Sequence, residues 1–337
     1  MPPEIVGNNF IPSIESELKN TVAWVKRSDQ EDLFHILAYH MGWEGQGSGP
    51  NTRGKRIRPL LVLLTASSSG GEMERALPAA AAVELVHNFS LIHDDIQDES
   101  PLRHGRPTVW KLWGVAQAIN AGDAMYTLAY MALLRLELTT SPEIALQASR
   151  ILQETCLSLT QGQFLDVSYE TRDDLTVDEY WPMVNGKTAS LLGACTELGA
   201  LVVNSNDEVR DSYRKFGQLL GLAFQIYDDI LGIWGDQALT GKSIESDLIT
   251  GKKTLPVLFG LSLDGPFANR WRRGNITMGE VPALARQLEL EGARSYTEEQ
   301  AHNLTDQALI ALNSAHPVGD SGDELAKLAL WLLGRRT

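Results

Sequence analysis

Long apolar stretches with helical spacing restrict the fold of this 337-residue chain more than any other feature. Apolar side chains recur every three or four residues, the spacing of one helical face, over residues 75–99, 116–138, 144–167, 189–203 and 209–233. Alternating Val, Ile and Thr runs between tight turns, which predict strands, are almost absent. These segments are apolar on more than one face, as is typical of helices inside a large bundle. We predict an all-α fold and a single domain over residues 1–337.

Charge and targeting features exclude several classes of partner. Acidic residues outnumber basic ones, 43 to 29, which gives a net charge of −14. Nucleic acids and anionic membranes favour surplus Lys and Arg, so neither is expected as a partner. The N-terminus has no basic segment followed by an apolar one, and no run approaches the ~20 apolar residues that span a bilayer. We therefore expect no transmembrane segment and a cytoplasmic protein, in keeping with only two cysteines, Cys156 and Cys195.

Three aspartates, Asp94, Asp95 and Asp98, follow directly after an apolar helical stretch. In a helix, Asp94 and Asp98 lie one turn apart on one face, with Asp95 beside them. Acids at the end of a buried stripe need a partner, because an unpaired buried carboxylate is very costly. Mg²⁺ is the natural partner, since it takes one or two carboxylates and fills its other positions with water and phosphate oxygens. The alternative is a solvated acidic helix end.

A second apolar helix also ends in paired aspartates, Asp228 and Asp229. Two such helix ends in one bundle can face each other across a cavity. Gly232 stands where a third carboxylate would be expected, and Asp236 follows in a segment that reads as a loop. The pattern predicts a second metal site with fewer protein ligands than the first.

Basic residues gather in the Gly- and Pro-rich segments between the helices, in the sequences GKRIRP (54–59), RHGRPT (103–108), KT (187–188), Lys242 and KK (252–253). Any one of them alone could be an ordinary surface cation. Together with carboxylates that bind Mg²⁺, they make the composition of a polyphosphate site. A P-loop is excluded, because residues 235–243 are one residue too long for that motif and no strand precedes them.

Seven sequence motifs in a fixed order identify a resemblance: GKRIRP, ELVHNFSLIHDDIQD, LRHGRPT, GKTASLLGACTELGA, FQIYDDILGIWGD, TGKS and SDLITGKKTLP. The chain resembles the trans-type isoprenyl diphosphate synthases of the polyprenyl synthetase family, most closely the geranylgeranyl type. The resemblance implies a helical bundle of the isoprenoid synthase type, usually homodimeric, with two aspartate motifs facing across a central cavity. It also implies that an allylic diphosphate condenses with isopentenyl diphosphate and that pyrophosphate is released.

The resemblance also implies roles for individual residues. Asp94 and Asp98 resemble ligands of two Mg²⁺ ions supported by Asp95, and Asp228, with Asp229 beside it, resembles the ligand of a third, so that about three ions bind per site with the substrate diphosphate. The positions that hold the allylic diphosphate are matched by Arg103, Lys187, Gln225 and Lys242, with Thr188 next to Lys187 and Lys252 closing over the substrate. The isopentenyl diphosphate pocket is matched by Lys55, Arg58 and His87.

Two positions depart from the family pattern. His104 stands where the family commonly has a second arginine that serves isopentenyl diphosphate. A histidine can donate a hydrogen bond but carries charge only when protonated, so we expect weaker homoallylic binding unless Arg106 compensates. Gly232 removes a carboxylate that the family uses mainly through water, which predicts at most a reduced affinity for the third metal.

Product length depends on the residues about one turn before Asp94, because the growing prenyl tail must run down between the helices. Ser90 lies about one turn (~5–6 Å) below Asp94 on nearly the same face, and Phe89 lies on the flank. From periodicity alone Phe89 could simply be a core residue. By resemblance, a bulky residue followed by a small one is the geranylgeranyl pattern, so we predict mainly the C20 product. Farnesyl (C15) or longer products, a diverged enzyme that cyclises or couples prenyl diphosphates, and a non-catalytic synthase subunit remain as alternatives.

Overall fold

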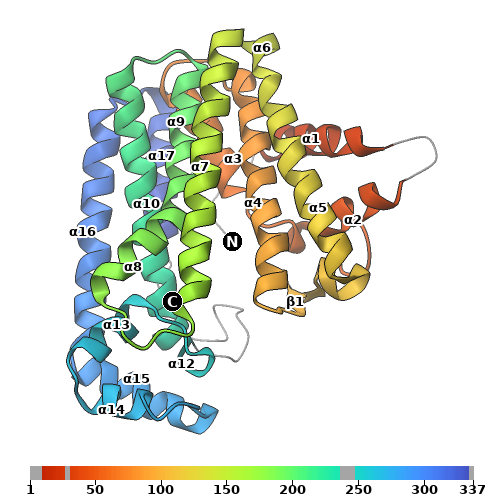
Figure 1. Cartoon of the computed structure of the whole chain (residues 1–337). Helices are drawn as coiled ribbons and strands as arrows, with labels where there is room; N and C mark the ends of the chain where they lie inside the picture. Colours follow the sequence, from red (N-terminus) through yellow and green to blue (C-terminus); the bar gives the residue numbers. More distant parts are fainter. Residues whose placement is uncertain (1–9, 27–30, 236–246, 334–337) are drawn as a thin grey trace. The chain divides into compact units, whose positions relative to one another are not determined.

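The computed structural model describes residues 10–26, 31–235 and 247–333, and most of them are helical (Figure 1). Strands among these residues are limited to a two-residue antiparallel hairpin, β1 (Leu102–Arg103) and β2 (Arg106–Pro107). The prediction of an all-α fold is therefore confirmed. Within the same ranges, no helix is long and apolar enough to cross a membrane.

The chain divides into two compact units, each built from separate segments. The first comprises Met1–Cys156, Ala194–Tyr213 and Ala315–Leu325, and the second comprises Leu157–Gly193, Arg214–Ser314 and Ala326–Thr337. Helices α7 (Pro142–Tyr169), α9 (Ser190–Val202), α10 (Asp207–Trp234) and α17 (Gly319–Leu333) each have residues in both units. The expectation of one domain over residues 1–337 stays a prediction.

The first unit is organised around α4 (Leu77–Gln97), which packs along α5 (Val109–Leu134) (Figure 1, orange and yellow). Residues 79–82 are four consecutive alanines, the best helix formers, and Pro78 lies in the first turn, where a backbone N–H has no helical partner. Gly122 of α5 allows a close approach, because a Cβ there would overlap the His93 ring of α4. The remaining helices of this unit are α1 (Ile11–Val22), α2 (Asp32–His40), α3 (Ile57–Ser68) and α6 (Leu136–Thr139).

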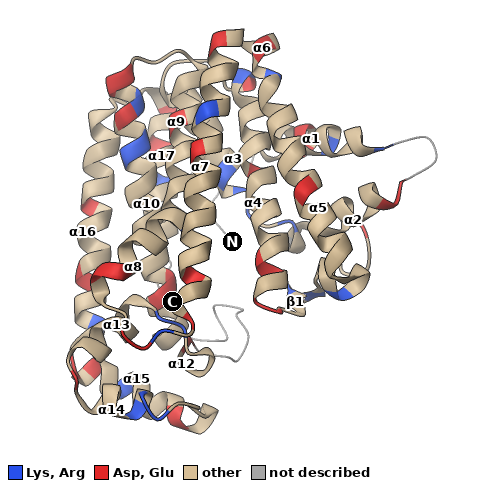
Figure 2. Cartoon of the chain, in the orientation of Figure 1, with Lys and Arg blue, Asp and Glu red and all other residues tan. Residues whose placement is uncertain are grey.

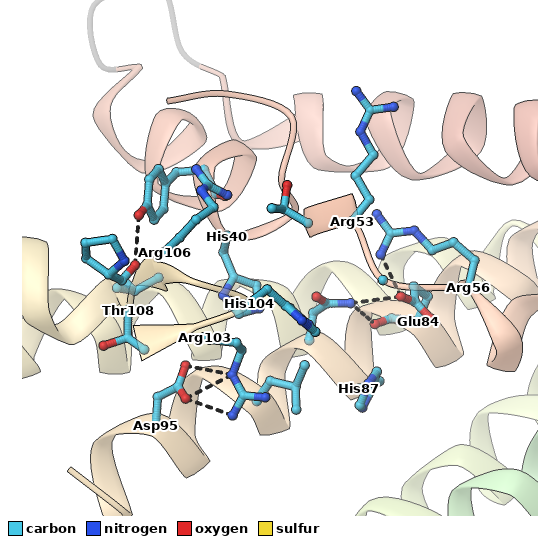
Figure 3. A pocket seen from close by; sticks show the side chains of 17 residues that line it. His40, Arg53, Arg56, Glu84, His87, Asp95, Arg103, His104, Arg106 and Thr108 are labelled. Atoms are coloured by element: carbon cyan, nitrogen blue, oxygen red, sulfur yellow. Dashed lines mark hydrogen bonds and ion pairs between the residues drawn. The ribbon is translucent and has the colours of Figure 1, made fainter. Parts of the chain in front are cut away.

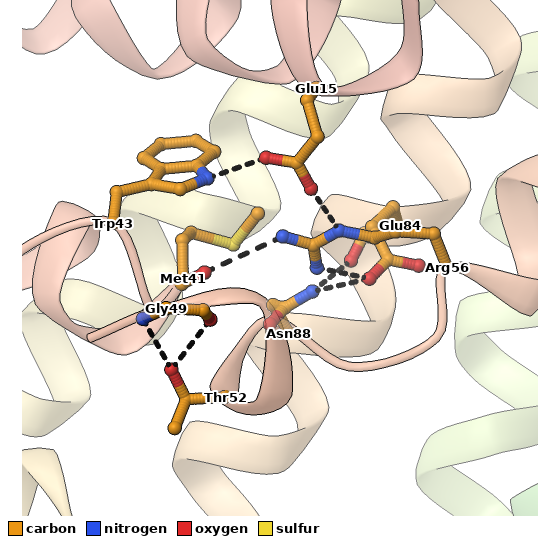
Figure 4. Close-up of polar contacts among 8 residues, drawn as sticks. All are labelled: Glu15, Met41, Trp43, Gly49, Thr52, Arg56, Glu84 and Asn88. Carbon is orange, nitrogen blue, oxygen red and sulfur yellow. Dashed lines mark hydrogen bonds and ion pairs between the residues drawn. The ribbon is translucent and has the colours of Figure 1, made fainter. Parts of the chain in front are cut away.

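A buried arginine connects the start of the chain to α4. Arg56 is 4% exposed, and it donates to Glu15 of α1 and to Glu84 of α4, each at 2.7 Å (Figure 4). Trp43 donates to Glu15 at 2.7 Å, and Asn88 donates to Glu84 at 3.2 Å. Removing one member of a buried ion pair typically costs ~3–5 kcal/mol, because the other charge is left without compensation. This network therefore holds α1, the segment before α3, and α4 together.

The second unit carries a π-helix (Asn185–Ala189) directly after α8 (Val177–Val184). Gly162 of α7 makes room for it, because a Cβ at residue 162 would lie 2.6 Å from the Gly186 carbonyl carbon. Its other elements are α12 (Asp247–Thr250), α13 (Leu255–Ser262), α14 (Pro266–Trp271), α15 (Val281–Leu290) and α16 (Ala293–Ser314). A buried apolar cluster that includes Leu248, Val257, Phe267 and Leu288 joins them.

Candidate functional site

The first acidic motif stands at the C-terminal end of α4 (Figure 2). Asp94 is partly buried and Asp98 is exposed, and the Asp98 amide closes the last turn onto the Asp94 carbonyl at 2.8 Å. Carboxylates at this end of a helix meet the negative end of its dipole and repel each other across one turn. Two aspartates there destabilise the helix, and a bound cation relieves that cost.

Asp95, between them in the sequence, has a different environment. Its side chain is 2% exposed and accepts hydrogen bonds from Arg103 Nε at 2.9 and 3.1 Å (Figure 3). Arg103 Nη2 lies 2.8 Å from the same carboxylate. Burial raises the pKa of Asp95, and the hydrogen bonds from Arg103 oppose that rise. Asp95 therefore fixes the direction of Arg103.

The β-hairpin brings Arg103 back to α4. His104 and Gly105, between the two strands, have φ angles of 51° and 74°. Two consecutive residues with positive φ form the tight hairpin turn whose twist matches the flanking strands. The residue that replaces the family's second arginine thus stands at an exposed turn immediately after Arg103.

The second acidic motif, near the end of α10, likewise has one partly exposed and one buried aspartate. Asp228 is partly buried, whereas Asp229 is 4% exposed. The Asp229 carboxylate accepts hydrogen bonds from Tyr180 Oη at 2.8 Å, from Gln225 Nε2 at 3.0 Å and from the Leu255 amide at 3.0 Å. Burial raises its pKa to about 6, although all three hydrogen bonds act in the opposite direction. Asp229 therefore ties α8, α10 and α13 together.

The predicted diphosphate ligands of the second unit are also held by neighbours. Thr188 donates to Gln225 Oε1 at 3.0 Å, so the Gln225 amide is fixed between Thr188 and Asp229. Lys187, in the π-helix, forms an ion pair with Asp166 of α7. Lys252 is exposed, and Lys242 lies outside the described residues.

A pocket in the first unit brings together residues assigned to both substrates, His87 and His104 to isopentenyl diphosphate and Arg103 to the allylic diphosphate (Figure 3). Arg58 is not among the lining residues, but its charge contributes to lowering the pKa of His87, after the larger effect of burial. The Arg58 Nε atom is buried and has no hydrogen-bond partner. Lys55 is exposed.

Sequence reasoning did not identify His40, which lines the same pocket from the end of α2. Its Nε2 atom is buried and has no hydrogen-bond partner, and burial together with the charge of Arg103 lowers its pKa to about 3. His40 precedes the GKRIRP segment by fourteen residues. No local spacing marks it, because only the folding of α2 brings it to the pocket.

Arg106 has a structural role that leaves it unable to take the place of the family's second arginine. Its guanidinium donates to the backbone carbonyls of Tyr39, Glu44 and Gln46 at 2.9, 2.7 and 3.0 Å. It also lies 3.9 Å from the centre of the Tyr39 ring. Arg106 is therefore committed to holding the loop after α2, and it does not replace the missing second arginine.

Comparison with known proteins decides the family. The profile described as Polyprenyl synthetase matches residues 49–275. The chain belongs to the polyprenyl synthetase family. It is 39% identical to a (2E,6E)-farnesyl diphosphate synthase of Mycobacterium tuberculosis over 311 residues, covering 89% of this chain and 86% of that protein. It is 46% identical to a geranylgeranyl diphosphate synthase of the same species over 237 residues, covering 70% and 67%.

Solved structures support the same assignment. A polyprenyl synthetase from Streptomyces coelicolor A3(2) superposes with a TM-score of 0.87 at 36% identity, over 97% of this chain and 98% of that one. The isoprenoid synthase fold and the prenyltransferase class expected from the sequence are thereby confirmed. That the two aspartate motifs face each other across a central cavity stays a prediction.

The carboxylates of the two motifs are of the kind that fits Mg²⁺ bound together with a diphosphate. Across residues 10–26, 31–235 and 247–333, no group of three or more His, Cys, Asp or Glu side chains is arranged to hold a metal ion. Mg²⁺ needs no such cage, because it usually keeps several waters and takes one or two carboxylates plus substrate phosphates. Asp94 and Asp98 in the first unit, and Asp228 in the second, are hard oxygen donors of that kind, and their role as Mg²⁺ ligands stays a prediction.

The synthetase also has an aromatic cluster at the position assigned to product length. The Phe89 ring meets His93 at 4.9 Å and Tyr126 at 5.2 Å between ring centres, and Tyr126 meets Tyr130 at 4.9 Å. Ser90, by contrast, turns its hydroxyl to the His87 carbonyl at 2.8 Å. Phe89 is thus packed against α5, and Tyr126 and Tyr130 extend the aromatic surface along that helix.

Proposed function

We propose that this chain condenses isopentenyl diphosphate with an allylic prenyl diphosphate to give a longer trans-prenyl diphosphate, mainly geranylgeranyl diphosphate. One observation carries the proposal. In each acidic motif the first aspartate is partly exposed, and the second is buried and hydrogen-bonded to a side chain assigned to the diphosphate, Arg103 through Asp95 and Gln225 through Asp229. Such pairing keeps donors in place before substrate arrives, so they need no reorganisation during the reaction.

The allylic diphosphate is the leaving group in this reaction. Asp94, Asp98 and Asp228 would hold Mg²⁺, which supplies neutralisation of the charge that develops as the allylic C–O bond breaks. Arg103 binds the diphosphate as a guanidinium oriented by Asp95. Lys187, paired with Asp166, and Gln225, fixed by Thr188, bind it in the same way, as the family resemblance implies. Lys242 and Lys252 complete this set in the proposal.

Isopentenyl diphosphate binds in the pocket of the first unit. Arg58, His87 and Lys55 bind its diphosphate, and His104 donates a hydrogen bond instead of a second guanidinium charge. Holding the two substrates nearly in contact supplies much of the rate, because association has already been achieved. Water must be excluded, since it would convert the allylic cation into an alcohol.

The proposal of a C20 product rests on the aromatic cluster formed by Phe89, Tyr126 and Tyr130. Phe89, Tyr126 and Tyr130 present bulky rings on α4 and α5, whereas Ser90 leaves the first turn below Asp94 open. The relative named geranylgeranyl diphosphate synthase agrees with C20, and the one named farnesyl diphosphate synthase supports C15 as the alternative.

A homodimer is supported by exposed apolar side chains along α5. Val115, Ile119, Met131 and Leu134 are between 43% and 55% exposed on this helix. Apolar side chains exposed along one helix in this number are typical of an interface. Sedimentation of the purified chain should give twice the chain mass, and Ile119→Lys with Met131→Lys should shift it to the monomer. A cytoplasmic location stays a prediction.

The test of the proposed function is incubation of the purified chain with Mg²⁺, isopentenyl diphosphate and allylic primers of different lengths, followed by product sizing. Elongated products that stop mainly at C20 are expected. Products formed without consumption of isopentenyl diphosphate would assign the chain to a cyclising or coupling enzyme instead. No turnover with any primer would leave it as a non-catalytic subunit.

A further inference from the structure

The pocket of the first unit carries more positive charge than its own carboxylates balance (Figure 3). Among the described residues that line it, four are arginines and two are acids. Each acid is paired with one arginine, Glu84 with Arg56 and Asp95 with Arg103. Of the other two arginines, Arg53 has a buried Nε atom without a hydrogen-bond partner. An anion in this pocket therefore meets a surplus of positive charge.

His40, in the same pocket, is carried by an anchored stretch of chain. It is the last residue of α2, and the carbonyl of the preceding Tyr39 accepts a hydrogen bond from Arg106 Nη1 at 2.9 Å. The Tyr39 hydroxyl donates to the Pro107 carbonyl at 2.8 Å, and the Trp113 ring meets the Tyr39 ring edge-on at 5.1 Å. The end of α2 is thereby tied to β2, so the backbone that presents the imidazole is in place before a ligand arrives.

The His40 ring offers the pocket a nitrogen that the protein itself leaves unused. Its Nε2 atom is buried and has no hydrogen-bond partner. Buried polar atoms are nearly always paired, so an unpaired one in a pocket marks a place for a ligand or a water. Burial and the charges of Arg103, Arg56 and His104 lower the pKa of His40 to about 3, and a hydrogen bond with Asn88 opposes this. The ring is therefore neutral near pH 7 in the unliganded chain.

We propose that His40 is a further ligand of the diphosphate that binds in this pocket, and that its ring takes up a proton as the anion binds. The inference rests on the proposed function. A negative charge beside an imidazole favours the charged ring, because it offsets the repulsion from neighbouring arginines. Once charged, the ring donates from both nitrogens, so Nε2 donates to a phosphate oxygen whichever nitrogen carried the first proton.

The size of the effect is sufficient to change the state of the ring. At the effective dielectric constant of a protein surface, one unit charge about 4 Å away raises the pKa of a histidine by roughly 3. A prenyl diphosphate carries more than one negative charge, so its arrival offsets the lowering caused by burial and the arginines. Because the complex then holds a proton that the free chain lacks, affinity for isopentenyl diphosphate should fall as the pH rises.

Two other histidines of the pocket must be separated from His40 in any test. His87 lies on α4 and His104 at the hairpin turn, and burial is the main cause that lowers the pKa of each. The competing explanation for His40 is that it only fills space between α2 and α4. A structural role of that kind does not require the ring to change its charge, and its loss affects both substrates alike.

The experiment measures proton uptake when isopentenyl diphosphate binds to the full chain, by isothermal titration calorimetry near neutral pH in buffers of different ionisation enthalpy. EDTA and the omission of an allylic primer exclude metal binding and turnover. The unmodified chain should take up about one proton more per bound molecule than His40→Gln, which should bind about ten-fold more weakly. His35→Gln, at an exposed position of the same helix, should match the unmodified chain.

Steady-state kinetics give an independent readout. His40→Gln should raise the KM for isopentenyl diphosphate, leave the KM for the allylic substrate nearly unchanged, and approach the unmodified enzyme at alkaline pH. Equal proton uptake in both proteins, or an equal rise of both KM values, overturns the inference, and so does a lack of proton uptake by the unmodified chain, which needs no variant. If the unmodified chain binds no isopentenyl diphosphate and makes no product, the proposed function fails. Elongation without proton uptake that depends on His40 removes this inference alone.

Discussion

The Asp95 carboxylate holds the Arg103 guanidinium from two directions, through Nε at 2.9 Å and through Nη2 at 2.8 Å. The two residues are eight positions apart, one at the end of α4 and the other in the hairpin that follows. The aspartate is buried and the arginine is about a third exposed, so the pair presents one guanidinium edge outward. This arrangement makes Asp95 a positioning residue for the Arg103 guanidinium.

Neutralising Asp95 should therefore damage catalysis through Arg103. Asp95→Asn keeps the shape but removes the charge-assisted hydrogen bonds, which are typically worth ~1.5–3 kcal/mol. We expect kcat/KM for the allylic substrate to fall about 10- to 100-fold. Glu137→Gln, on the exposed surface of α6, is the matched control and should leave steady-state kinetics unchanged. An Asp95→Asn enzyme with normal kinetics would show that Arg103 needs no such support.

The accessible aspartates should be indispensable. Asp94→Ala or Asp98→Ala removes a metal ligand and leaves phosphate charge uncompensated, so turnover should be abolished while the helical circular dichroism spectrum stays unchanged. Asp228→Ala should behave similarly. Asp94 and Asp98 stand at the unfavourable end of α4, so the loss of either carboxylate should not lower thermal stability. Near-normal activity in Asp94→Ala or Asp98→Ala contradicts the metal assignment.

His104 should limit the affinity for isopentenyl diphosphate. His104→Arg restores a permanent charge at the hairpin turn, so the KM for isopentenyl diphosphate should fall and the KM for the allylic substrate should stay nearly constant. Arg106 is bound to backbone carbonyls and offers no substitute. If the isopentenyl KM does not fall, another group in the pocket already serves the diphosphate, and His40→Ala, which should then raise that KM, identifies it.

Product length should respond to the aromatic cluster. Phe89→Ala should lengthen the products, and Ser90→Phe should shorten them towards C15, as measured by chromatography of the dephosphorylated alcohols. Tyr126 packs on Phe89, so the double variant with Tyr126→Ala should extend the products beyond those of Phe89→Ala. Products of unmodified length from both variants would place the floor of the channel on another helix.

His40 should make the fold sensitive to acid. Its pKa is lowered to about 3 in the folded chain, so below pH ~6.5 the unfolded chain binds a proton that the folded chain does not. Its contribution to stability is complete above that pH and is lost by up to ~1.4 kcal/mol per pH unit as the pH falls towards 3. His40→Gln should flatten this dependence in urea titrations between pH 6.5 and 4.5. Parallel curves for both proteins would assign the acid sensitivity elsewhere.

Local pattern was sufficient to predict the helices, and it singled out the first aspartate of each motif as a candidate metal ligand. Helical periodicity and the run of alanines in α4 can be recognised from residues close together in the sequence. The same holds for the spacing that places Asp94 and Asp98 one turn apart. The accessible carboxylates could be recognised because they interrupt an apolar stripe within a few residues. The family motifs then indicated the chemistry, since their order along the chain is itself a local observation.

The partners of these residues were decided by tertiary structure alone. Three pairs of contacting residues are far apart in the sequence, and no periodicity relates such positions. The separations are 21 residues for Asp166 and Lys187, 49 for Tyr180 and Asp229, and 15 for Gly232 and Asp247. The commitment of Arg106 to three backbone carbonyls likewise became visible only when the loop after α2 was in place. The sequence determines which groups can bind metal and phosphate, because those properties belong to single side chains. Which of these side chains are buried, and which neighbours they bond to, depends on packing between segments that are distant in the sequence.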